Sequence, residues 1–349
     1  MEVKKEHICT LHGKEVSKIK FTNDNNYSLE FFNYGGYFHK ILIPYKNHVD
    51  KYEDVILGYE KFKDYLTDQH YINALVGRVC GRIANAKFVL NGKEYILNKN
   101  DGYHHIHGGE KGFSKNIWKI NNIEKEKDHL ICELFYRSKD LEDGYPGNVD
   151  CIAKYSLNNK NEIIIDLSAT TDKDTIINLT NHNYWNFHGH KNFYQKINDH
   201  FIKIDSDYVC EVDKDQIPSG KLIDVSKTKY DLRKIKKIDK SILDQDGIDH
   251  CYTINKNKKL TEVSSIYSDY TKMGMILFTD QPGLQLYTGN MMAKKYLGKC
   301  DKEYGLQHGI CLEAQQYPDA INQPNFINPI LKPGEKYSSK IIMKLKNNF

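Results

Sequence analysis

Apolar and polar residues alternate along much of this chain, and the alternation predicts strands more often than helices. Between residues 149 and 157 the positions 149, 151, 153, 155 and 157 are apolar or small, and polar side chains at 150, 154 and 156 share the other face. A period of two is typical of a half-buried antiparallel strand. Comparable runs predict further strands over residues 130–136, 163–167, 274–278 and 340–345.

Turn and helix signals are fewer. Asn91-Gly92 stands between the runs 88–90 and 95–97, and it accepts the positive φ angles of a tight hairpin turn. Leu57 to Asp68 predicts one short helix with Phe62, Tyr65 and Leu66 on one side. Residues 226–246 mix charges with irregularly spaced apolar residues, and we expect a loop with short helical turns there.

Many short strands, few helices and no repeated βαβ rhythm favour an all-β protein, a large antiparallel β-sandwich or barrel. No linker or composition shift divides the 349 residues, so we expect a single domain over 1–349.

Net charge narrows the kinds of partner that the sequence indicates, and cysteine spacing narrows the cellular compartment. The formal net charge is only +4 and both signs are interspersed, which gives no indication of nucleic acid or a membrane as partner. No apolar run approaches the ~20 residues of a membrane span, and the N-terminal residues lack an apolar signal region. None of the eight cysteines forms a Cys-x-x-Cys pair. We therefore expect buried free thiols in a cytoplasmic protein.

Residues 178–187, Asn-Leu-Thr-Asn-His-Asn-Tyr-Trp-Asn-Phe, carry the strongest indication of chemistry. A core strand would not hold so many hydrogen-bonding side chains, since each needs a partner when buried. Amides, aromatic rings and one group that titrates near neutral pH suit a concave polar site. We predict that His182 is a catalytic acid there. Tyr184 or Trp185 could form an apolar wall, although core packing fits Trp185 equally well.

Other candidates lie far away in the chain. Glu313 ends an apolar run, and burial would raise its pKa towards that of a general base; it could equally cap a backbone group or pair with an arginine. Arg82, four residues after Arg78, could donate to hydroxyls or a carboxylate, or form ordinary salt bridges. Asp249 and Gln285 are polar residues in apolar surroundings, and each could bind hydroxyls.

Two His-x-His pairs, His105 with His107 and His188 with His190, leave two interpretations open. On a strand, this spacing puts both imidazoles on one side, as a metal pair requires. Alternatively, one histidine hydrogen-bonds a ligand and the others are structural.

Six segments in the same order make the chain resemble the aldose 1-epimerase (galactose mutarotase) family. The matching segments are Gly77-Arg78-Val79 with Arg82-Ile83-Ala84, Ile106 to Gly109 with Lys111 to Phe113, Asp143 to Gly147, Asn178 to His182, Pro282 to Asn290, and Leu312-Glu313 with Gln315 and Pro318 to Pro324. Gly81 departs from the family pattern, which often has an asparagine before the arginine.

The resemblance implies a large antiparallel β-sandwich, no metal or other cofactor, and interconversion of the α and β anomers of free aldohexoses such as galactose and glucose. It implies Glu313 as base, His182 as acid, and Arg82, His107, Asp249 and Gln285 as sugar ligands, to which we add Tyr184. The expected partner is a small aldose, and the protein a monomer or homodimer. Three alternatives remain: a hexose-6-phosphate 1-epimerase, a carbohydrate-binding protein without activity, and a metal-dependent hydrolase using the His-x-His pairs.

Overall fold

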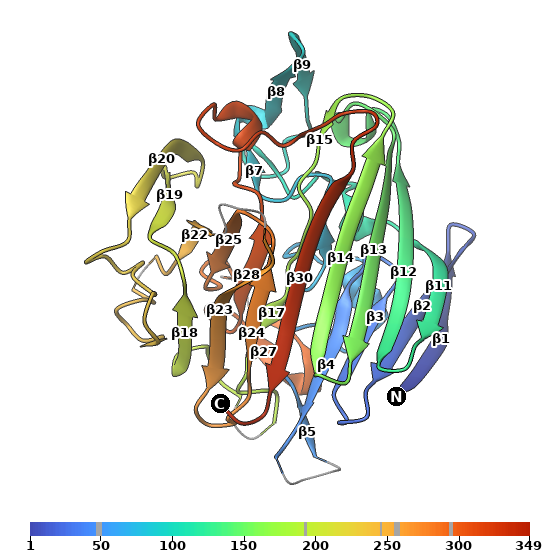
Figure 1. The fold of residues 1–349 in the computed structure, drawn as a ribbon, viewed down its shortest axis with the longest axis vertical. Helices are drawn as coiled ribbons and strands as arrows, with labels where there is room; N and C mark the ends of the chain where they lie inside the picture. The colour runs from blue at the N-terminus through green and yellow to red at the C-terminus, as the bar shows by residue number, and fades with distance from the viewer. Residues whose placement is uncertain (47–50, 192–193, 245, 255–258, 293–295) are drawn as a thin grey trace.

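The computed structural model describes residues 1–46, 51–191, 194–244, 246–254, 259–292 and 296–349. Three antiparallel sheets dominate it, as the alternating sequence pattern predicts (Figure 1). Within the described residues, no helix has the length and apolar character needed to cross a membrane.

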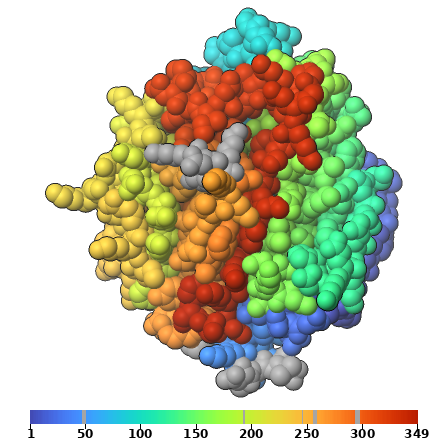
Figure 2. Space-filling model, viewed as in Figure 1, coloured from blue at the N-terminus to red at the C-terminus, as the bar shows by residue number. Residues whose placement is uncertain are grey.

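The largest sheet has nine strands and gathers segments from distant parts of the chain. Its last strand in sequence, β30, lies between β14 and β24, near the middle of the sheet (Figure 1). On the face shown in Figure 2, the red C-terminal residues accordingly separate green residues from orange ones. In spatial order the strands are β11 (Lys119–Lys125), β12 (His129–Ser138), β13 (Val149–Asn158), β14 (Glu162–Thr171), β30 (Tyr337–Lys346), β24 (Gly274–Thr279), β23 (Thr261–Ser268), β18 (His200–Ile204) and β21 (Lys236–Lys237).

A second sheet has six strands, and it carries most of the candidate residues. In spatial order these are β17 (Tyr184–Trp185), β28 (Ile310–Gln315), β25 (Gly283–Tyr287), β22 (Asp249–Thr253), β19 (Tyr208–Val212) and β20 (Pro218–Asp224). The third sheet follows chain order: β1 (Glu2–Leu11), β2 (Lys14–Thr22), β3 (Ser28–Phe32), β4 (Phe38–Pro44) and β5 (Tyr52–Asp54).

Short strand pairs and helical turns complete the fold. The pairs are β7 (Arg82–Ile83) with β10 (His105–Ile106), β6 (Leu75–Val76) with β16 (Thr180–Asn181), β8 (Lys87–Leu90) with β9 (Lys93–Ile96), β15 (Thr175–Ile176) with β29 (Ile330–Leu331), and β26 (Tyr296–Leu297) with β27 (Glu303–Tyr304). The helical segments are α1 (Phe62–Tyr65) and the 3-10 turns Ala84–Ala86, Phe113–Lys115, Glu142–Gly144, Lys299–Asp301 and Ala320–Asn322.

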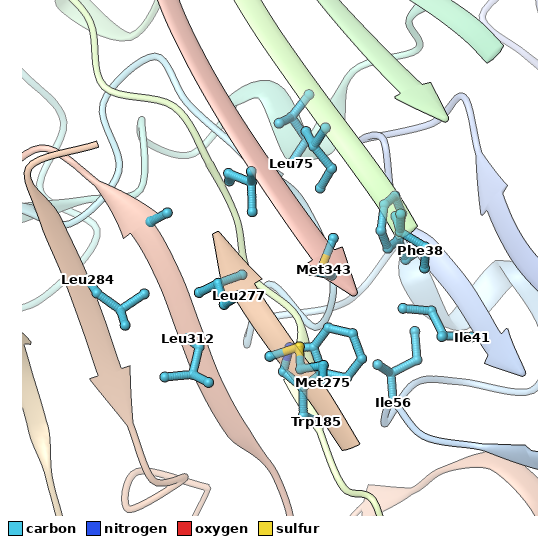
Figure 3. Close-up of a cluster of buried hydrophobic side chains, with 14 of the residues drawn as sticks. Phe38, Ile41, Ile56, Leu75, Trp185, Met275, Leu277, Leu284, Leu312 and Met343 are labelled. Carbon is cyan, nitrogen blue, oxygen red and sulfur yellow. The ribbon is translucent and has the colours of Figure 1, made fainter. Parts of the chain in front are cut away.

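The main hydrophobic core lies where the three sheets meet. Phe38 of β4, Met343 of β30 and Leu312 of β28 belong to one buried cluster, which Figure 3 shows with its neighbours. Full burial of each such side chain typically contributes about 1.5–3 kcal/mol. Because strand residues alternate, Leu312 and Ala314 belong to this core while Glu313 between them belongs to the opposite face of β28.

The predicted strands are confirmed, as is the hairpin, in which Asn91 (φ 52°) and Gly92 (φ 74°) form the turn. The predicted helix is confirmed only as four residues, and Leu66 is 37% exposed. The loop predicted over 226–246 is confirmed for the described residues: it contains no helix, only isolated turns on either side of β21, such as the one closed by the amide of Leu243 and the carbonyl of Asp239. All eight cysteines are free, but Cys9 is half-buried and Cys300 is exposed.

Candidate active site

One cavity of about 230 Å³ brings the distant candidate residues together. It lies against the face of the six-stranded sheet that is turned away from the main core. The seven residues expected to catalyse the reaction or bind the sugar all line it, namely Arg82, His107, His182, Tyr184, Asp249, Gln285 and Glu313.

Strand register places four of these side chains side by side. Gln285 of β25 is the register partner of Glu313 of β28, and Asp249 of β22 is opposite Tyr287, two residues further along β25. Tyr184 of β17 pairs with Cys311 on the other edge of β28. Residues two apart on a strand share a face, so the sheet holds these groups on one rigid surface.

His182 follows β16 and meets Glu313 from outside the sheet. Its Nε2 lies 3.5 Å from Oε1 of Glu313, and both side chains are withdrawn from water. Burial, reinforced by the charge of Asp249, raises the pKa of Glu313 well above its usual value, and burial lowers the pKa of His182 to about 4. Burial therefore favours the neutral forms of both groups. Glu313 Oε2 is buried and has no hydrogen-bond partner among the described residues, so it can accept one from a ligand.

His107 is held in one orientation by the backbone. The amide of Gly81 donates a hydrogen bond to its Nδ1 at 3.3 Å, which requires an unprotonated Nδ1. Burial lowers the pKa of His107 well below its usual value, so the ring is neutral and carries its proton on Nε2. Gly81, the departure from the family pattern, has a φ of 75°, and a Cβ there would lie 3.1 Å from Pro318. Glycine thus suits this close approach.

Arg82, Asp249 and Gln285 form a polar chain along one wall. Arg82 Nε donates to Asp101 at 2.7 Å, its NH1 lies 3.8 Å from Asp249, and Gln285 Nε2 donates to Asp249 at 2.6 Å. Burial raises the pKa of Asp249. The Gln285 carbonyl is buried without a described partner, which leaves it available to a ligand hydroxyl.

The two aromatic candidates, Tyr184 and Trp185, lie on opposite faces of β17. Tyr184 lines the cavity and stacks on His182, with ring centroids 5.0 Å apart and planes at 21°. Trp185 points to the other face of β17, into the main core, where it stacks on Phe187. Core packing is therefore the correct interpretation of Trp185. The neighbouring amides are structural as well: Asn186, for example, donates to the backbone carbonyls of Gln195 and His308.

Of the two interpretations left open for the His-x-His pairs, the structure favours separate roles for the histidines over paired metal ligands. His105 is tied to the carbonyl of Asn98 and the hydroxyl of Tyr145, whereas His107 lines the cavity. His188 and His190 contact different partners: the first meets Ser268 and the carbonyl of Asn198, the second the carbonyl of Asp54 and Tyr304. Arg78 is structural too, since it is buried and donates to Pro146, Ser138, Thr175 and Lys139.

Sequence reasoning missed several residues of the site. Asp101 fixes Arg82, Tyr71 packs edge-on against His107 at 4.7 Å, and Cys311 lies 3.5 Å from Nδ1 of His182. The alternation of side chains along β28 could have indicated Cys311, because residues two apart share a face and Cys311 therefore shares one with Glu313. The donor atoms of Cys311, His182 and Glu313 lie within 4.8 Å of one another, close enough to hold a metal ion. Such clusters also occur where no metal is needed, and the metal-free site stays a prediction.

Comparison with known proteins agrees with this geometry. The family model for aldose 1-epimerase matches residues 17–344. A galactose mutarotase from Bos taurus is 36% identical over 294 residues, 84% of each chain, and an aldose 1-epimerase from Haemophilus influenzae is 34% identical over 343 residues, 96% of this chain and 97% of that one. The solved galactose 1-epimerase from Lactobacillus acidophilus NCFM superposes with a TM-score of 0.85 at 26% identity, covering 100% of this chain and 99% of that one. Members of this family act on aldose sugars. The chain therefore belongs to the aldose 1-epimerase family, a family of carbohydrate isomerases.

Proposed function

We propose that this protein interconverts the α and β anomers of free aldohexoses such as galactose and glucose, with Glu313 as base and His182 as acid. One observation carries the proposal: Nε2 of His182 and Oε1 of Glu313 lie 3.5 Å apart at the wall of a cavity of sugar size. The anomeric hydroxyl and the ring oxygen of a sugar are bonded to one carbon. Two groups at this separation can therefore reach one oxygen each.

The reaction follows from moving two protons. Glu313 removes the proton of the anomeric hydroxyl while the imidazolium of His182 protonates the ring oxygen, and the C1–O5 bond breaks. This leaves an aldehyde, a neutral imidazole and a neutral carboxylic acid, the forms that burial favours. Rotation about C1–C2 presents the other aldehyde face, and both proton transfers then run in reverse. No electrons or groups leave the sugar, so the proposal includes no cofactor.

Arg82, His107, Asp249 and Gln285 hold the sugar by its hydroxyls in this proposal. His107 Nε2–H donates and the free carbonyl of Gln285 accepts, while Tyr184 supports the ring of His182. Neutral hydroxyls both donate and accept, which suits a wall of mixed donors and acceptors.

The charges favour a free sugar over a sugar phosphate. Arg82 is the permanent cation among the described lining residues, and Asp101 and Asp249 both lie beside it. A phosphate would meet a cation that carboxylates already neutralise. Polarimetry of freshly dissolved α-galactose, α-glucose and glucose 6-phosphate tests the assignment. Acceleration of the free sugars supports it; a preference for the phosphate, or binding without acceleration, contradicts it.

We also propose one domain over residues 1–349 in a monomer or homodimer, located in the cytoplasm. The nine-stranded sheet combines strands between residues 119 and 346, which supports one folding unit, and eight free cysteines suit a reducing compartment. Limited proteolysis, sedimentation and cell fractionation test the three points. A stable proteolytic subdomain would contradict the single domain, and a larger oligomer would contradict the monomer or homodimer. Secretion of the protein would contradict the cytoplasmic location.

A further inference from the structure

The unassigned feature nearest the proposed chemistry is a buried thiol beside His182. Cys311 Sγ lies 3.5 Å from Nδ1 of His182, and the ligand atoms of Cys311, His182 and Glu313 all lie within 4.8 Å of one another. Cys311 is fully buried, and it sits on β28 two residues before Glu313. Two neighbouring same-face residues of one strand thus contact the two nitrogens of one imidazole.

The other neighbours of the ring hold it in place. Tyr184, the register partner of Cys311, stacks on one face of His182, and His107 meets it edge-on at 5.1 Å. The titratable groups around this imidazole are therefore Glu313, Cys311, His107 and Tyr184, with the charge of His70 also acting on it.

Proton transfer at Nε2 sets a requirement for Nδ1. The imidazolium carries protons on both nitrogens, and after it protonates the ring oxygen the neutral ring must keep the proton on Nδ1 so that Nε2 can take one back. Nδ1–H therefore needs acceptors throughout the cycle, and a backbone hydrogen bond within residue 182 already acts on the ring beside the sulfur. Sulfur is a weak acceptor with a long hydrogen bond, and 3.5 Å suits N–H···S.

We propose that Cys311 is a positioning residue for the acid, its sulfur accepting a hydrogen bond from Nδ1–H of His182 so that Nε2 is the nitrogen that exchanges the proton. This inference rests on the proposed role of His182. Burial raises the pKa of the Cys311 thiol well above its usual value, so the acceptor is uncharged. A carboxylate in its place would hold the proton on the imidazolium more strongly and weaken it as an acid.

The opposite hydrogen bond makes the inference testable. If the thiol donated to Nδ1 instead, the neutral ring would carry its proton on Nε2 and could not receive one there. Two-bond ¹H–¹⁵N couplings of ¹⁵N-histidine-labelled protein distinguish these tautomers without any turnover. We expect neutral His182 to be protonated on Nδ1. Protonation on Nε2 alone overturns the proposal.

Variants then test the role of the sulfur. Cys311→Ala should lower kcat about tenfold and leave KM within about twofold of wild type. It should also mix the two tautomers of His182 and shift both limbs of the pH profile. Cys311→Ser keeps an acceptor, so its kcat should stay within about threefold of wild type. Cys132→Ala, which removes a buried thiol from β12, is the control and should leave kcat unchanged. Equal losses in the Ala and Ser variants, or a wild-type rate and tautomer in Cys311→Ala, overturn the proposal. An active His182→Asn protein refutes the acid itself, a separate failure from the tautomer result.

Discussion

His182 and Glu313 are separated by many strands in the chain, yet their Nε2 and Oε1 atoms lie 3.5 Å apart in one buried cavity. Removing either titratable group should abolish anomer exchange. Glu313→Gln keeps the shape of the side chain and His182→Asn replaces the imidazole with a smaller amide that does not titrate. Each should lower kcat by roughly 10²–10⁴-fold, the usual contribution of a proton transfer. Polarimetry of α-galactose measures the rate, with circular dichroism as the control for folding. A Glu313→Gln protein with the wild-type rate would remove Glu313 from the base role.

The pH dependence should be bell-shaped with a broad plateau. The pair needs one shared proton: when both groups are protonated there is no base, and when both have lost their protons there is no acid. The lowered pKa of His182, about 4, puts the acid limb low, and the raised pKa of Glu313 moves the alkaline limb upward. The apparent pKa values of the two limbs of the kcat/KM profile describe the coupled pair and not either residue alone. A profile without either limb between about pH 4 and 10 in folded protein would count against paired proton transfer.

Arg82→Lys should weaken sugar binding more than it slows the chemistry. One ammonium cannot bond Asp101 and also extend towards Asp249, as the guanidinium does. We expect KM to rise about tenfold, with kcat within about threefold of wild type. Initial-rate polarimetry over a range of galactose concentrations separates the two constants. An unchanged KM would show that Arg82 does not bind the sugar.

Arg78 offers the contrasting variant. Its buried guanidinium donates to four residues away from the cavity, so Arg78→Lys should lower the free energy of unfolding by roughly 2–4 kcal/mol. Urea titration measures the change. The KM of the protein that remains folded should match wild type, and a selective rise in KM would instead place Arg78 in the sugar site.

Lowering the pH should destabilise the fold at values where ordinary carboxylates are still ionised. Burial lowers the pKa of His105 and of His190 to about 4, so between about pH 6.5 and 4 the unfolded chain binds protons that the folded protein does not. Their stabilising contribution is complete above pH 6.5 and is lost as the pH falls. At pH 5 the loss is roughly 1–2 kcal/mol for each histidine. Urea titrations at pH 7 and pH 5 test this, and His105→Gln should reduce the difference; equal stability at both values would refute it.

Chelation should leave the activity unchanged. The proposed mechanism takes both protons from side chains, although Cys311, His182 and Glu313 lie close enough to hold an ion. Dialysis against EDTA followed by polarimetry, with metal analysis of the same sample, tests this prediction. Loss of the rate on chelation and its recovery with Zn²⁺ would favour a metal-dependent site.

Regular local patterns were readable from the sequence, whereas long-range geometry was not. Alternation over residues 149–157 and the Asn91-Gly92 turn act between near neighbours, and both predictions hold. The helix over 57–68 is shorter than predicted because Asp68 accepts hydrogen bonds from Tyr59 and the amides of residues 70 and 72, which turns the chain. Local propensity cannot foresee such contacts.

The candidate site shows the same contrast between what the sequence predicts and what depends on long-range contacts. The family likeness selected the residues that now surround one cavity. The His-x-His spacing could not decide between its two interpretations, because β10 covers only His105–Ile106 and His107 follows it at φ 53°. Side chains alternate regularly only while the backbone remains extended. Cys311 went unnoticed because its partner, His182, belongs to a different part of the chain.

The position of β30 between β14 and β24 has a consequence for biosynthesis. Until residues 337–346 have left the ribosome, two half-sheets present unpaired inner edges to the surrounding solution. The edge of β14 therefore stays unpaired from the synthesis of residues 162–171 onward, and chaperone protection would matter most between the synthesis of β24 and the docking of β30.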